Sequence, residues 1–377
     1  MTPNHIGTSL WEFDVDRLHF PSLDTNLEAD LCVVGLGASG LRAAMHGAQR
    51  GLRVVGIDAG LIAGAAAGRN GGLLLAGTAD FYNDACDRLG NARAKVVYQH
   101  TLDELDQVVA LLEGNARMTG VLRAEDTEEG LKHAARHLAA LQRDGFTAHE
   151  YDGPQGQGIV IPTDGSFHPV QRAMTFAQLA TNLGVQLFEN TSTSSVSSNE
   201  VITAHGVISA RYVLVATDGF LRRVLPELVT DIRQVRLQML ATAPDSLELE
   251  YPSYSHFGYD YWQQRPDGRV AIGGGRHRVM ESEFTDDDTP TRELFEYLEA
   301  RLRGLGVHAP VTHHWAAIVS YANNDVPVAR EVMPSVWGLG AFNGTGNVIG
   351  TMLGRALVDQ MIDGYSVIVN DLFNATE

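Results

Sequence analysis

Gly35-Leu36-Gly37-Ala38-Ser39-Gly40 decides the fold of this chain. This GxGxxG turn, called the glycine turn below, follows a short apolar run at residues 30–34 and opens a stretch of helix-forming residues at 41–50. A second apolar run, residues 53–57, comes next. Strand, turn, helix and strand make a βαβ unit, whose right-handed crossover places both strands in one parallel sheet. The sequence therefore predicts a Rossmann-like dinucleotide-binding domain.

The glycines of this turn and the acidic residue after the second strand have separate roles. Gly37 lets a pyrophosphate approach the backbone at the start of the helix, where amide groups and the helix dipole favour negative charge. Asp58, at the end of the second run, is expected to bind the adenosine ribose hydroxyls. Because its carboxylate would repel a 2′-phosphate, the pattern favours FAD or NAD over NADP. The predicted contacts are Gly35, Gly37, Ala38, Ser39, Gly40, Asp58 and Ala59.

Composition excludes several classes of protein. The chain has 377 residues, 44% of them hydrophobic and 20% charged, as in ordinary soluble globular proteins. No uninterrupted apolar stretch is long enough to span a bilayer. With 28 Lys and Arg against 46 Asp and Glu, the formal net charge of −18 would repel phosphate backbones. Nucleic acid is therefore not expected as a partner.

The cysteines and histidines suggest neither a disulfide framework nor a metal site. Only Cys32 and Cys86 occur, without a CxxC pair. His313 and His314 are neighbours in an expected strand, so they point to opposite faces and cannot chelate one ion together. The first residues also lack the basic and apolar regions of a secretory signal. We expect a cytoplasmic protein.

Further along the chain the patterns alternate between helix and strand. Apolar residues recur at helical spacing over residues 84–112 and 128–143. A Gly/Pro/Gln-rich stretch at 153–162 predicts a loop, and short strands are expected over 185–215. Pro266-Asp267-Gly268 separates two alternating segments and is typical of a β-hairpin. A helix is also predicted over 169–183.

Three glycine-containing stretches add a resemblance to a known family. They are Ala67-Gly68-Arg69-Asn70-Gly71-Gly72, Ala216-Thr217-Asp218-Gly219 after a strand, and Phe342-Asn343-Gly344-Thr345-Gly346-Asn347 before a helix. With the glycine turn they resemble the D-amino-acid-oxidase-like FAD-dependent oxidoreductase superfamily over nearly the whole chain. The GRNGG stretch and a Trp-containing N-terminal extension are similar to its branch of γ-glutamylputrescine, glycine and sarcosine oxidases.

This resemblance implies FAD and further cofactor contacts. Residues 69–72 would pass beside the flavin, Thr193 would touch the adenine through its backbone, and Ala216 with Thr217 would face the ADP half. The terminal glycine loop also has a physical interpretation, since amide groups and a helix dipole there would face the flavin edge that becomes negative on reduction. Close packing of the C-terminal helix is the alternative. The implied contacts are Arg69, Asn70, Gly71, Gly72, Thr193, Ala216, Thr217, Gly344, Thr345, Gly346, Asn347 and Val348.

Two departures concern the electron acceptor and the attachment of the flavin. Sarcosine-oxidase-like relatives carry a lysine that assists oxygen reduction, and the matching position here is Ala271. The electron acceptor is therefore either O2 or another molecule, and both alternatives remain open. Residues 315–321, where relatives with covalent flavin carry a cysteine, contain none. We expect noncovalent FAD.

Four residues near the hairpin are the candidate catalytic residues. Tyr259 and Tyr261 are two apart and would share one face of a strand, where they would stack on a substrate amine or pack in the sheet. Arg276 would hold a substrate carboxylate or lie on the surface. His277 would accept the ammonium proton or be structural.

The expected architecture is mixed α/β, a Rossmann-like FAD-binding domain with an inserted antiparallel-sheet substrate domain. We assign residues 1–80, 153–232 and 315–377 to the FAD-binding domain. Residues 81–152 form the helical part of the substrate domain, and residues 233–314 its antiparallel sheet.

The predicted function is oxidation of the C–N bond of a small amine or amino acid by hydride transfer to flavin N5. Three alternatives stay open. One is a dehydrogenase with the same fold that passes electrons to a quinone or carrier. Another is a flavin-containing subunit with little turnover of its own. A nicotinamide dehydrogenase is the weakest, because it would leave the other glycine loops unexplained.

Overall fold

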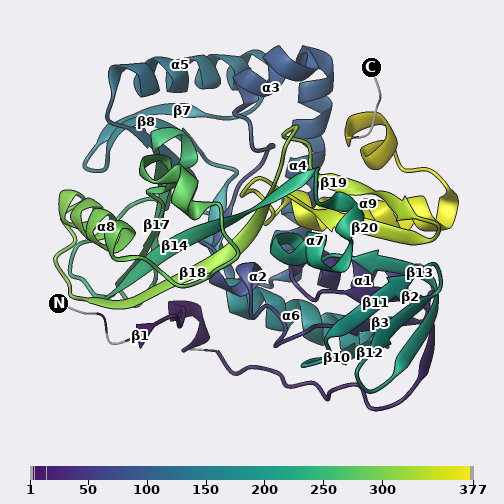
Figure 1. The fold of residues 1–377 in the computed structure, drawn as a ribbon. Coiled ribbons are helices and arrows are strands. Elements are labelled where there is room, and N and C mark those ends of the chain that lie inside the picture. Colours follow the sequence, from purple (N-terminus) through teal and green to yellow (C-terminus); the bar gives the residue numbers. More distant parts are fainter. Residues whose placement is uncertain (1–2, 4, 14, 374–377) are drawn as a thin grey trace. The chain divides into compact units, whose positions relative to one another are not determined.

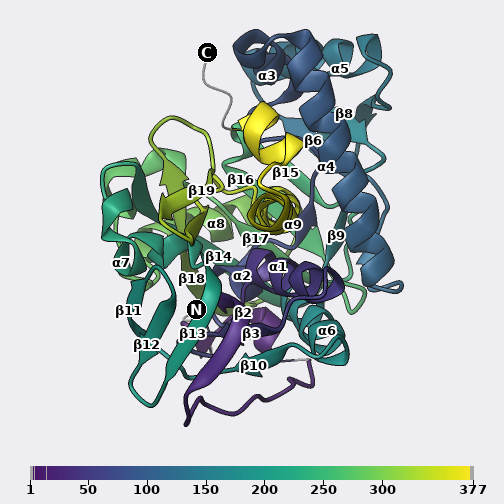
Figure 2. The ribbon, with the colours of Figure 1, turned by 90° about the vertical axis from the view of Figure 1, so that its right-hand side faces the viewer.

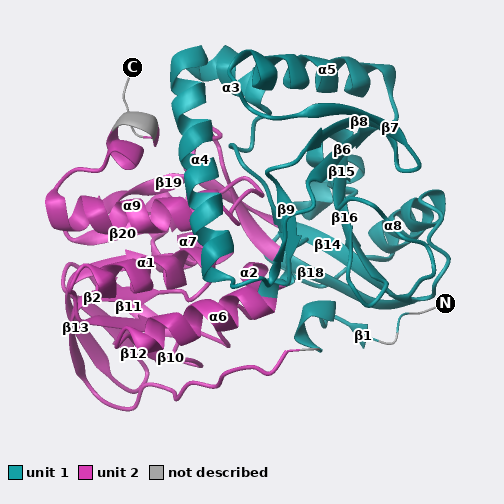
Figure 3. Cartoon of the chain, turned by 180° about the vertical axis from the view of Figure 1, so that it is seen from behind, with its two compact units in different colours: residues 1–14, 69–169, 236–317 teal, residues 15–68, 170–235, 318–377 magenta. Residues whose placement is uncertain are grey.

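The computed structural model describes all residues except 1–2, 4, 14 and 374–377 (Figure 1). The chain divides into two compact units, which Figure 3 shows in two colours. Unit 1 comprises residues 1–14, 69–169 and 236–317, and unit 2 comprises residues 15–68, 170–235 and 318–377. No helix of the described residues combines the length and apolarity needed to cross a membrane.

Unit 2 contains the predicted βαβ unit. β2 (Leu27–Val34) leads through the glycine turn into α1 (Ala38–Gln49), and β3 (Val54–Ile57) pairs with β2 in parallel. β3 and residues 31–34 of β2 are buried, as expected for a parallel sheet covered on both faces. The sheet order is β10-β3-β2-β13-β12-β11, with β20 beside β13 and β19 beside β20. The predicted Rossmann-like fold is confirmed.

Helices and short strands complete unit 2. α9 lies beside α1 in Figures 1 and 2, and a Cβ at Gly354 would be 2.5 Å from the Ser39 carbonyl oxygen, so the two helices pack closely. The other elements are α6 (Pro169–Asn182), β10 (Gln186–Phe188), β11 (Thr193–Ser197), β12 (Glu200–Thr203), β13 (Val207–Val215), α7 (Leu221–Val224), β19 (Val328–Met333), β20 (Val336–Gly340), α9 (Ile349–Asp363) and a π-helix at Val367–Phe373.

Unit 1 is built on a mixed sheet of order β1-β18-β14-β17-β16-β15-β6-β8-β7. β14 (Ile232–Pro244) and β18 (Val311–Ala322) begin or end in unit 2. Its remaining strands are β1 (His5–Ile6), β6 (Val121–Glu125), β7 (His149–Gly153), β8 (Gly156–Ile161), β15 (Ser253–Ser255), β16 (Asp260–Gln264) and β17 (Arg269–Gly273). β16 and β17 form the predicted hairpin.

Four helices and a small sheet belong to the same unit. The helices are α3 (Tyr82–Leu89), α4 (Asn91–Leu111), α5 (Glu128–Arg143) and α8 (Arg292–Gly304), and α2 (Ala66–Arg69) ends where unit 1 resumes. β4 (Leu73–Leu74), β9 (Gly165–Phe167) and β5 (Ala116–Arg117) form the small sheet. A core of α3, α4 and α5 side chains includes Ile159 and Ile161 of β8.

Two predictions about this unit were wrong. The expected loop at 153–162 is mostly strand, because Ile159, Val160 and Ile161 are buried and pair with β6. Pro154 and Gln155 form the tight turn between β7 and β8, and Gly156, the first residue of β8, has a φ of +107°. The expected helix over 84–112 is also divided, because Gly90 at a φ of +79° ends α3 and starts α4.

The predicted domain boundaries differ from those of the units. Residues 153–169 lie in unit 1, since β8 and β9 pair with strands of that unit. Residues 69–80 also belong to unit 1, beginning with the GRNGG stretch. That the FAD-binding domain and the substrate domain have the predicted bounds remains a prediction.

Candidate functional site

The glycine turn of unit 2 is shaped by close backbone contacts. Gly35 has a φ of +97°, and a Cβ there would lie 2.7 Å from the Ala216 carbonyl oxygen. At Gly40 a Cβ would lie 1.9 Å from the Gly35 carbonyl oxygen. Gly37 differs, since its backbone is extended and a Cβ would meet only the Cβ of Ala67, at 3.3 Å. The protein itself therefore requires Gly35 and Gly40, whereas Gly37 leaves space for a ligand.

Asp58 is fixed to this turn by hydrogen bonds. Its carboxylate accepts the N–H of Leu36 at 2.8 Å and the N–H of Gly60 at 3.0 Å. Burial raises the pKa of the carboxyl, while these two N–H groups act in the opposite direction. Asp58 thus stands beside the turn as the sequence predicts, with the exposed Ala59 next to it. That it binds ribose remains a prediction.

Two threonines of unit 2 have buried hydroxyl groups that no described residue satisfies. They are Thr193 in β11 and Thr217 after β13. The Thr217 methyl carbon lies 2.9 Å from the Cβ position of Gly35, so this threonine adjoins the glycine turn. Buried hydroxyl groups normally have partners. These orphaned oxygens and the open space at Gly37 fit a polar dinucleotide such as FAD.

The terminal glycine loop, residues 342–348, leads into α9 as the sequence predicts. The Thr345 hydroxyl donates to the Phe342 carbonyl oxygen at 2.8 Å, and Val348 is the N-cap residue of the helix. The Arg172 guanidinium donates to the side-chain and main-chain oxygens of Asn347, at 3.0 and 3.2 Å. Burial lowers the pKa of Arg172 to about 9. The α9 helix packs closely on α1 through Gly354. Contact of the loop residues with FAD remains a prediction.

Tyr261 in unit 1 lies between two glycines. A Cβ at Gly71 would be 2.6 Å from its ring, and one at Gly273 would be 2.5 Å from it. The structure thereby brings the hairpin and the GRNGG stretch together, both within unit 1. Only a glycine at each position leaves room for the ring.

The other three candidate residues form a separate cluster. The guanidinium carbon of Arg276 lies 5.1 Å from the centre of the Tyr259 ring, and the His277 ring lies 5.3 Å from it. The expected shared strand face of the two tyrosines was wrong, because β16 begins at Asp260 and Tyr259 has a helical backbone (φ −70°, ψ −26°).

His277 has an environment suited to accepting a proton. Burial lowers the pKa of its imidazole. The nearby Asp260 carboxylate raises this pKa by a smaller amount, and His256 lowers it further. Its Nδ1 is buried and finds no partner in the described part of the chain. The ring is therefore neutral at neutral pH.

Sequence reasoning missed the residue that holds this cluster. Asp260 is fully buried, and its carboxylate accepts the N–H of Gly275 at 2.9 Å, the Nδ1 of His256 at 2.8 Å and the hydroxyl of Tyr297 at 2.5 Å. The bond to Gly275, which has a φ of +79°, fixes the turn that carries Arg276 and His277. The sequence gives no signal for this role, because Asp260 begins a strand that also contains two glutamines and resembles a surface position.

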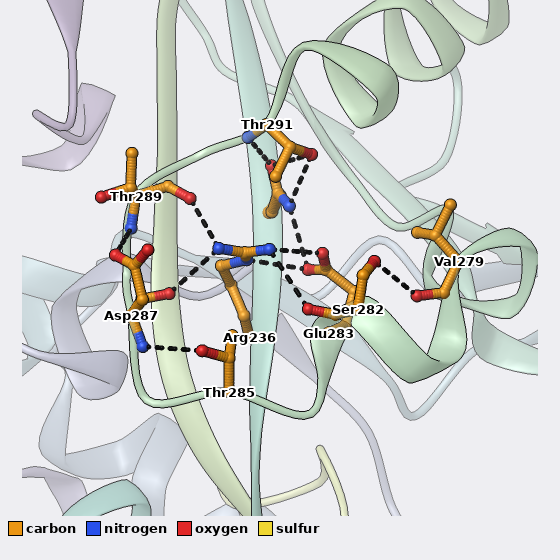
Figure 4. Close-up of polar contacts among 9 residues, drawn as sticks. Arg236, Val279, Ser282, Glu283, Thr285, Asp287, Thr289 and Thr291 are labelled. Atoms are coloured by element: carbon orange, nitrogen blue, oxygen red, sulfur yellow. Dashed lines mark hydrogen bonds and ion pairs between the residues drawn. The ribbon is translucent and has the colours of Figure 1, made fainter.

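A second buried network organises the segment after this turn (Figure 4). Arg236 donates to both carboxylate oxygens of Glu283, at 2.8 and 3.1 Å, and to the carbonyl oxygens of Asp287 and Thr289. Gln238 bonds to the same carboxylate at 2.9 Å. One guanidinium therefore sets the path of residues 282–289.

Arg69 is charge-compensated within unit 1. Its guanidinium lies 3.6 Å from the carboxylate of Glu12 and 3.7 Å from that of Asp288, and it donates to the Ala316 carbonyl oxygen at 3.1 Å. That Arg276, beside the Tyr259 ring, binds a substrate carboxylate remains a prediction. Among the described residues, no group of three or more His, Cys, Asp or Glu could hold a metal ion.

Asp164, the residue before β9 of the small sheet, gives a pH-dependent prediction. Burial raises the pKa of its carboxyl to about 8, and the N–H of Ala76 donates to it. Because the folded-state pKa lies above the unfolded value of roughly 3.9, the stability from this group is lost as pH rises from about 4 through 8. Asp164→Asn should therefore stabilise the protein by roughly 1–3 kcal/mol at pH 8 and have little effect at pH 4. Urea unfolding at both pH values tests this, and an equal effect at both would contradict it.

Comparisons with known proteins agree with this fold. The family model described as FAD dependent oxidoreductase, DAO, matches residues 30–360. The chain belongs to this family of FAD-dependent oxidoreductases. Glycine oxidase from Bacillus cereus is similar in structure, with a TM-score of 0.76 at 18% identity, over 93% of this chain and 99% of that one.

Two curated relatives and a second solved structure extend the comparison. "Probable oxidoreductase OrdL" of Rhizobium meliloti is 24% identical, over 94% of this chain and 88% of the relative. Gamma-glutamylputrescine oxidoreductase of Escherichia coli is 22% identical, over 90% and 85%. L-proline dehydrogenase from P. horikoshii has a TM-score of 0.74 at 18% identity, over 90% and 95%. The predicted family, fold class and cofactor FAD are confirmed; the individual site residues stay predictions.

Proposed function

We propose that this protein oxidises the C–N bond of a small amine or amino acid. FAD, when bound, supplies the acceptor for a hydride from the α-carbon, and the substrate becomes an imine that water hydrolyses. The names of the relatives support this substrate class, since they include a gamma-glutamylputrescine oxidoreductase and a glycine oxidase. The contacts assigned above to Asp58, Thr193, Thr217 and residues 344–348 would hold the cofactor.

The observation that carries the proposal is the cluster of Tyr259, Arg276 and His277. A guanidinium and a neutral imidazole stand on one turn, both beside a tyrosine ring. The guanidinium can bind a carboxylate, and the imidazole can accept the proton that an ammonium group must lose before a hydride leaves its α-carbon. The cluster therefore offers what an amino acid substrate requires.

The direct test is anaerobic mixing of the purified protein with a panel of amines and amino acids. We expect at least one compound to bleach the oxidised-flavin absorption band and to yield a carbonyl product. If dithionite bleaches the flavin and no panel member does, the proposed substrate class is wrong.

His277 gives a prediction about pH dependence. Because burial lowers its pKa below the ordinary value of about 6.5, the imidazole stays neutral at neutral pH, and kcat/KM should fall only on the acid side. His277→Gln should lower kcat/KM by about 10²-fold and remove this acid limb. The control is His314→Gln, since burial also lowers the pKa of His314, to about 4, and this histidine lies in β18, away from the turn that carries His277. An unchanged acid limb in His277→Gln would exclude the histidine as the base.

A dehydrogenase that passes electrons to a quinone or carrier is the second candidate. The observation that favours it is Ala271, which is buried in β17 opposite Ala241 and Gln263 and provides no cation for oxygen reduction. Peroxide formation in air at the rate of substrate oxidation would favour the oxidase. Fast turnover with a quinone and little peroxide would favour the dehydrogenase.

A further inference from the structure

All four backbone carbonyl groups of residues 69–72, called the cofactor loop below, are held by other parts of unit 1. The Trp315 indole N–H donates to the Arg69 oxygen at 2.8 Å, and the Trp11 indole N–H donates to the Asn70 oxygen at 2.9 Å. The Gln263 amide donates to the oxygens of Gly71 and Gly72, at 2.7 and 3.0 Å. Three side chains from three distant segments thus fix one short loop.

The first of these segments is an N-terminal strap, residues 5–12. It begins with β1, which pairs with β18, and the N–H of Gly7 donates to the His314 carbonyl oxygen at 2.8 Å. It ends in a 3-10 turn at Leu10–Glu12, where the Ser9 hydroxyl accepts the N–H of Trp11. Trp11 is 0% exposed. The strap is therefore anchored at both ends. Contacts other than the one with the cofactor loop also hold its Trp11 in place.

The strap also supplies charge to the loop. Its Glu12 and the distant Asp288 each lie within 4 Å of the Arg69 guanidinium. Asp288 lies between the two residues whose carbonyl oxygens bind Arg236. The backbone and the side chain of Arg69 are consequently both fixed. Trp315 binds its carbonyl oxygen, and carboxylates from two distant segments of unit 1 lie beside its guanidinium.

We propose that the strap is a positioning element for the cofactor loop, with Trp11 as its main positioning residue. It fixes the loop conformation before FAD binds, so that FAD binding does not bear the cost of ordering the loop. This inference rests on the proposed role of residues 69–72 in holding FAD. It assigns a function to a segment outside residues 30–360, the part that matches the family model.

The test replaces the indole N–H while keeping an aromatic ring. Trp11→Phe removes the bond to Asn70 and leaves the Asn70 carbonyl oxygen without this donor. Trp262→Phe is the matched control: Trp262 is 1% exposed in the same unit, and its indole nitrogen has no partner among the described residues. Both substitutions remove similar volume, and only one removes a bond to the cofactor loop.

Two measurements on the full-length protein report the outcome. FAD is titrated into the apoprotein of each variant, and trypsin cleavage after Arg69 is followed in the apoproteins. We expect Trp11→Phe to weaken FAD binding about tenfold and to speed cleavage at Arg69, with Trp262→Phe close to the unmodified protein. Trp315→Phe should behave like Trp11→Phe.

Other outcomes overturn the inference. Unchanged FAD affinity and unchanged cleavage in Trp11→Phe would show that the strap does not set the loop. Equal losses in Trp11→Phe and Trp262→Phe would assign the effect to core packing. Faster cleavage at Arg69 with unchanged FAD affinity would show that the strap orders the loop but that the loop does not hold FAD, which contradicts the proposed cofactor role of residues 69–72.

Discussion

Gly37→Val is expected to give a folded protein that lacks FAD. The backbone at Gly37 (φ −77°, ψ −170°) is one that any residue adopts, and its Cβ would meet only the Ala67 Cβ at 3.3 Å. The valine should therefore cost the fold about 1 kcal/mol or less as a helix N-cap residue. Its side chain would occupy the space that a pyrophosphate needs at the start of α1. FAD affinity should fall by at least about 10²-fold, equivalent to roughly 2.7 kcal/mol.

Absorbance after gel filtration and urea unfolding measure these two effects separately. Gly304→Val is a control for the glycine-to-valine change, because a Cβ at Gly304 meets nothing within 4 Å. Gly40→Ala provides the contrast, since its Cβ would lie 1.9 Å from the Gly35 carbonyl oxygen and should damage fold and FAD binding together. A yellow Gly37→Val protein with unchanged FAD affinity would contradict the role of the turn.

Arg236→Ala should destabilise the protein by about 3–5 kcal/mol. Both oxygens of Glu283 depend on Arg236 or Gln238, and Glu283 is 0% exposed. Removing the guanidinium leaves a buried carboxylate without its counter-ion and frees the carbonyl oxygens of Asp287 and Thr289. The segment that carries Asp288 should then become mobile, and Arg69 should lose one of its two carboxylates.

Chemical unfolding of Arg236→Ala beside Arg292→Ala checks this expectation. The Arg292 side chain is 90% exposed and pairs with Glu296 along one helix, so its removal should cost less than about 0.5 kcal/mol. The double variant Arg236→Met, Glu283→Met should recover part of the loss, because it removes both buried charges. Similar small effects of both arginine substitutions would show that the buried network does not stabilise unit 1.

Local patterns sufficed for the elements that depend on neighbours in sequence. The βαβ unit follows from two apolar runs, a glycine turn and a helix-forming stretch, and α5 spans residues 128–143 as its helical periodicity predicted. The hairpin of β16 and β17 follows from its Asp-Gly turn. In each case the interactions that form the element lie within about twenty residues of one another.

Interactions between distant segments were not predictable in the same way. The bond from Trp11 to Asn70 joins a side chain to a backbone oxygen, so it leaves no pattern at the accepting residue. Asp260 and Arg236 are polar residues in strands, where they resemble surface positions until their buried partners are known. Gly156 was assigned to a loop because glycine is common both in loops and in tight hairpin turns.

The rate of flavin reduction by an amine deuterated at its α-carbon tests the central claim most directly. The measurement uses an amine that bleaches the flavin without oxygen, compared with its undeuterated form. Oxidation at the C–N bond predicts a reduction rate that is several-fold slower for the deuterated amine, with an imine or its carbonyl product formed in amounts equal to the flavin reduced. Equal rates for both forms, with no imine or carbonyl product to match the flavin reduced, would contradict the account.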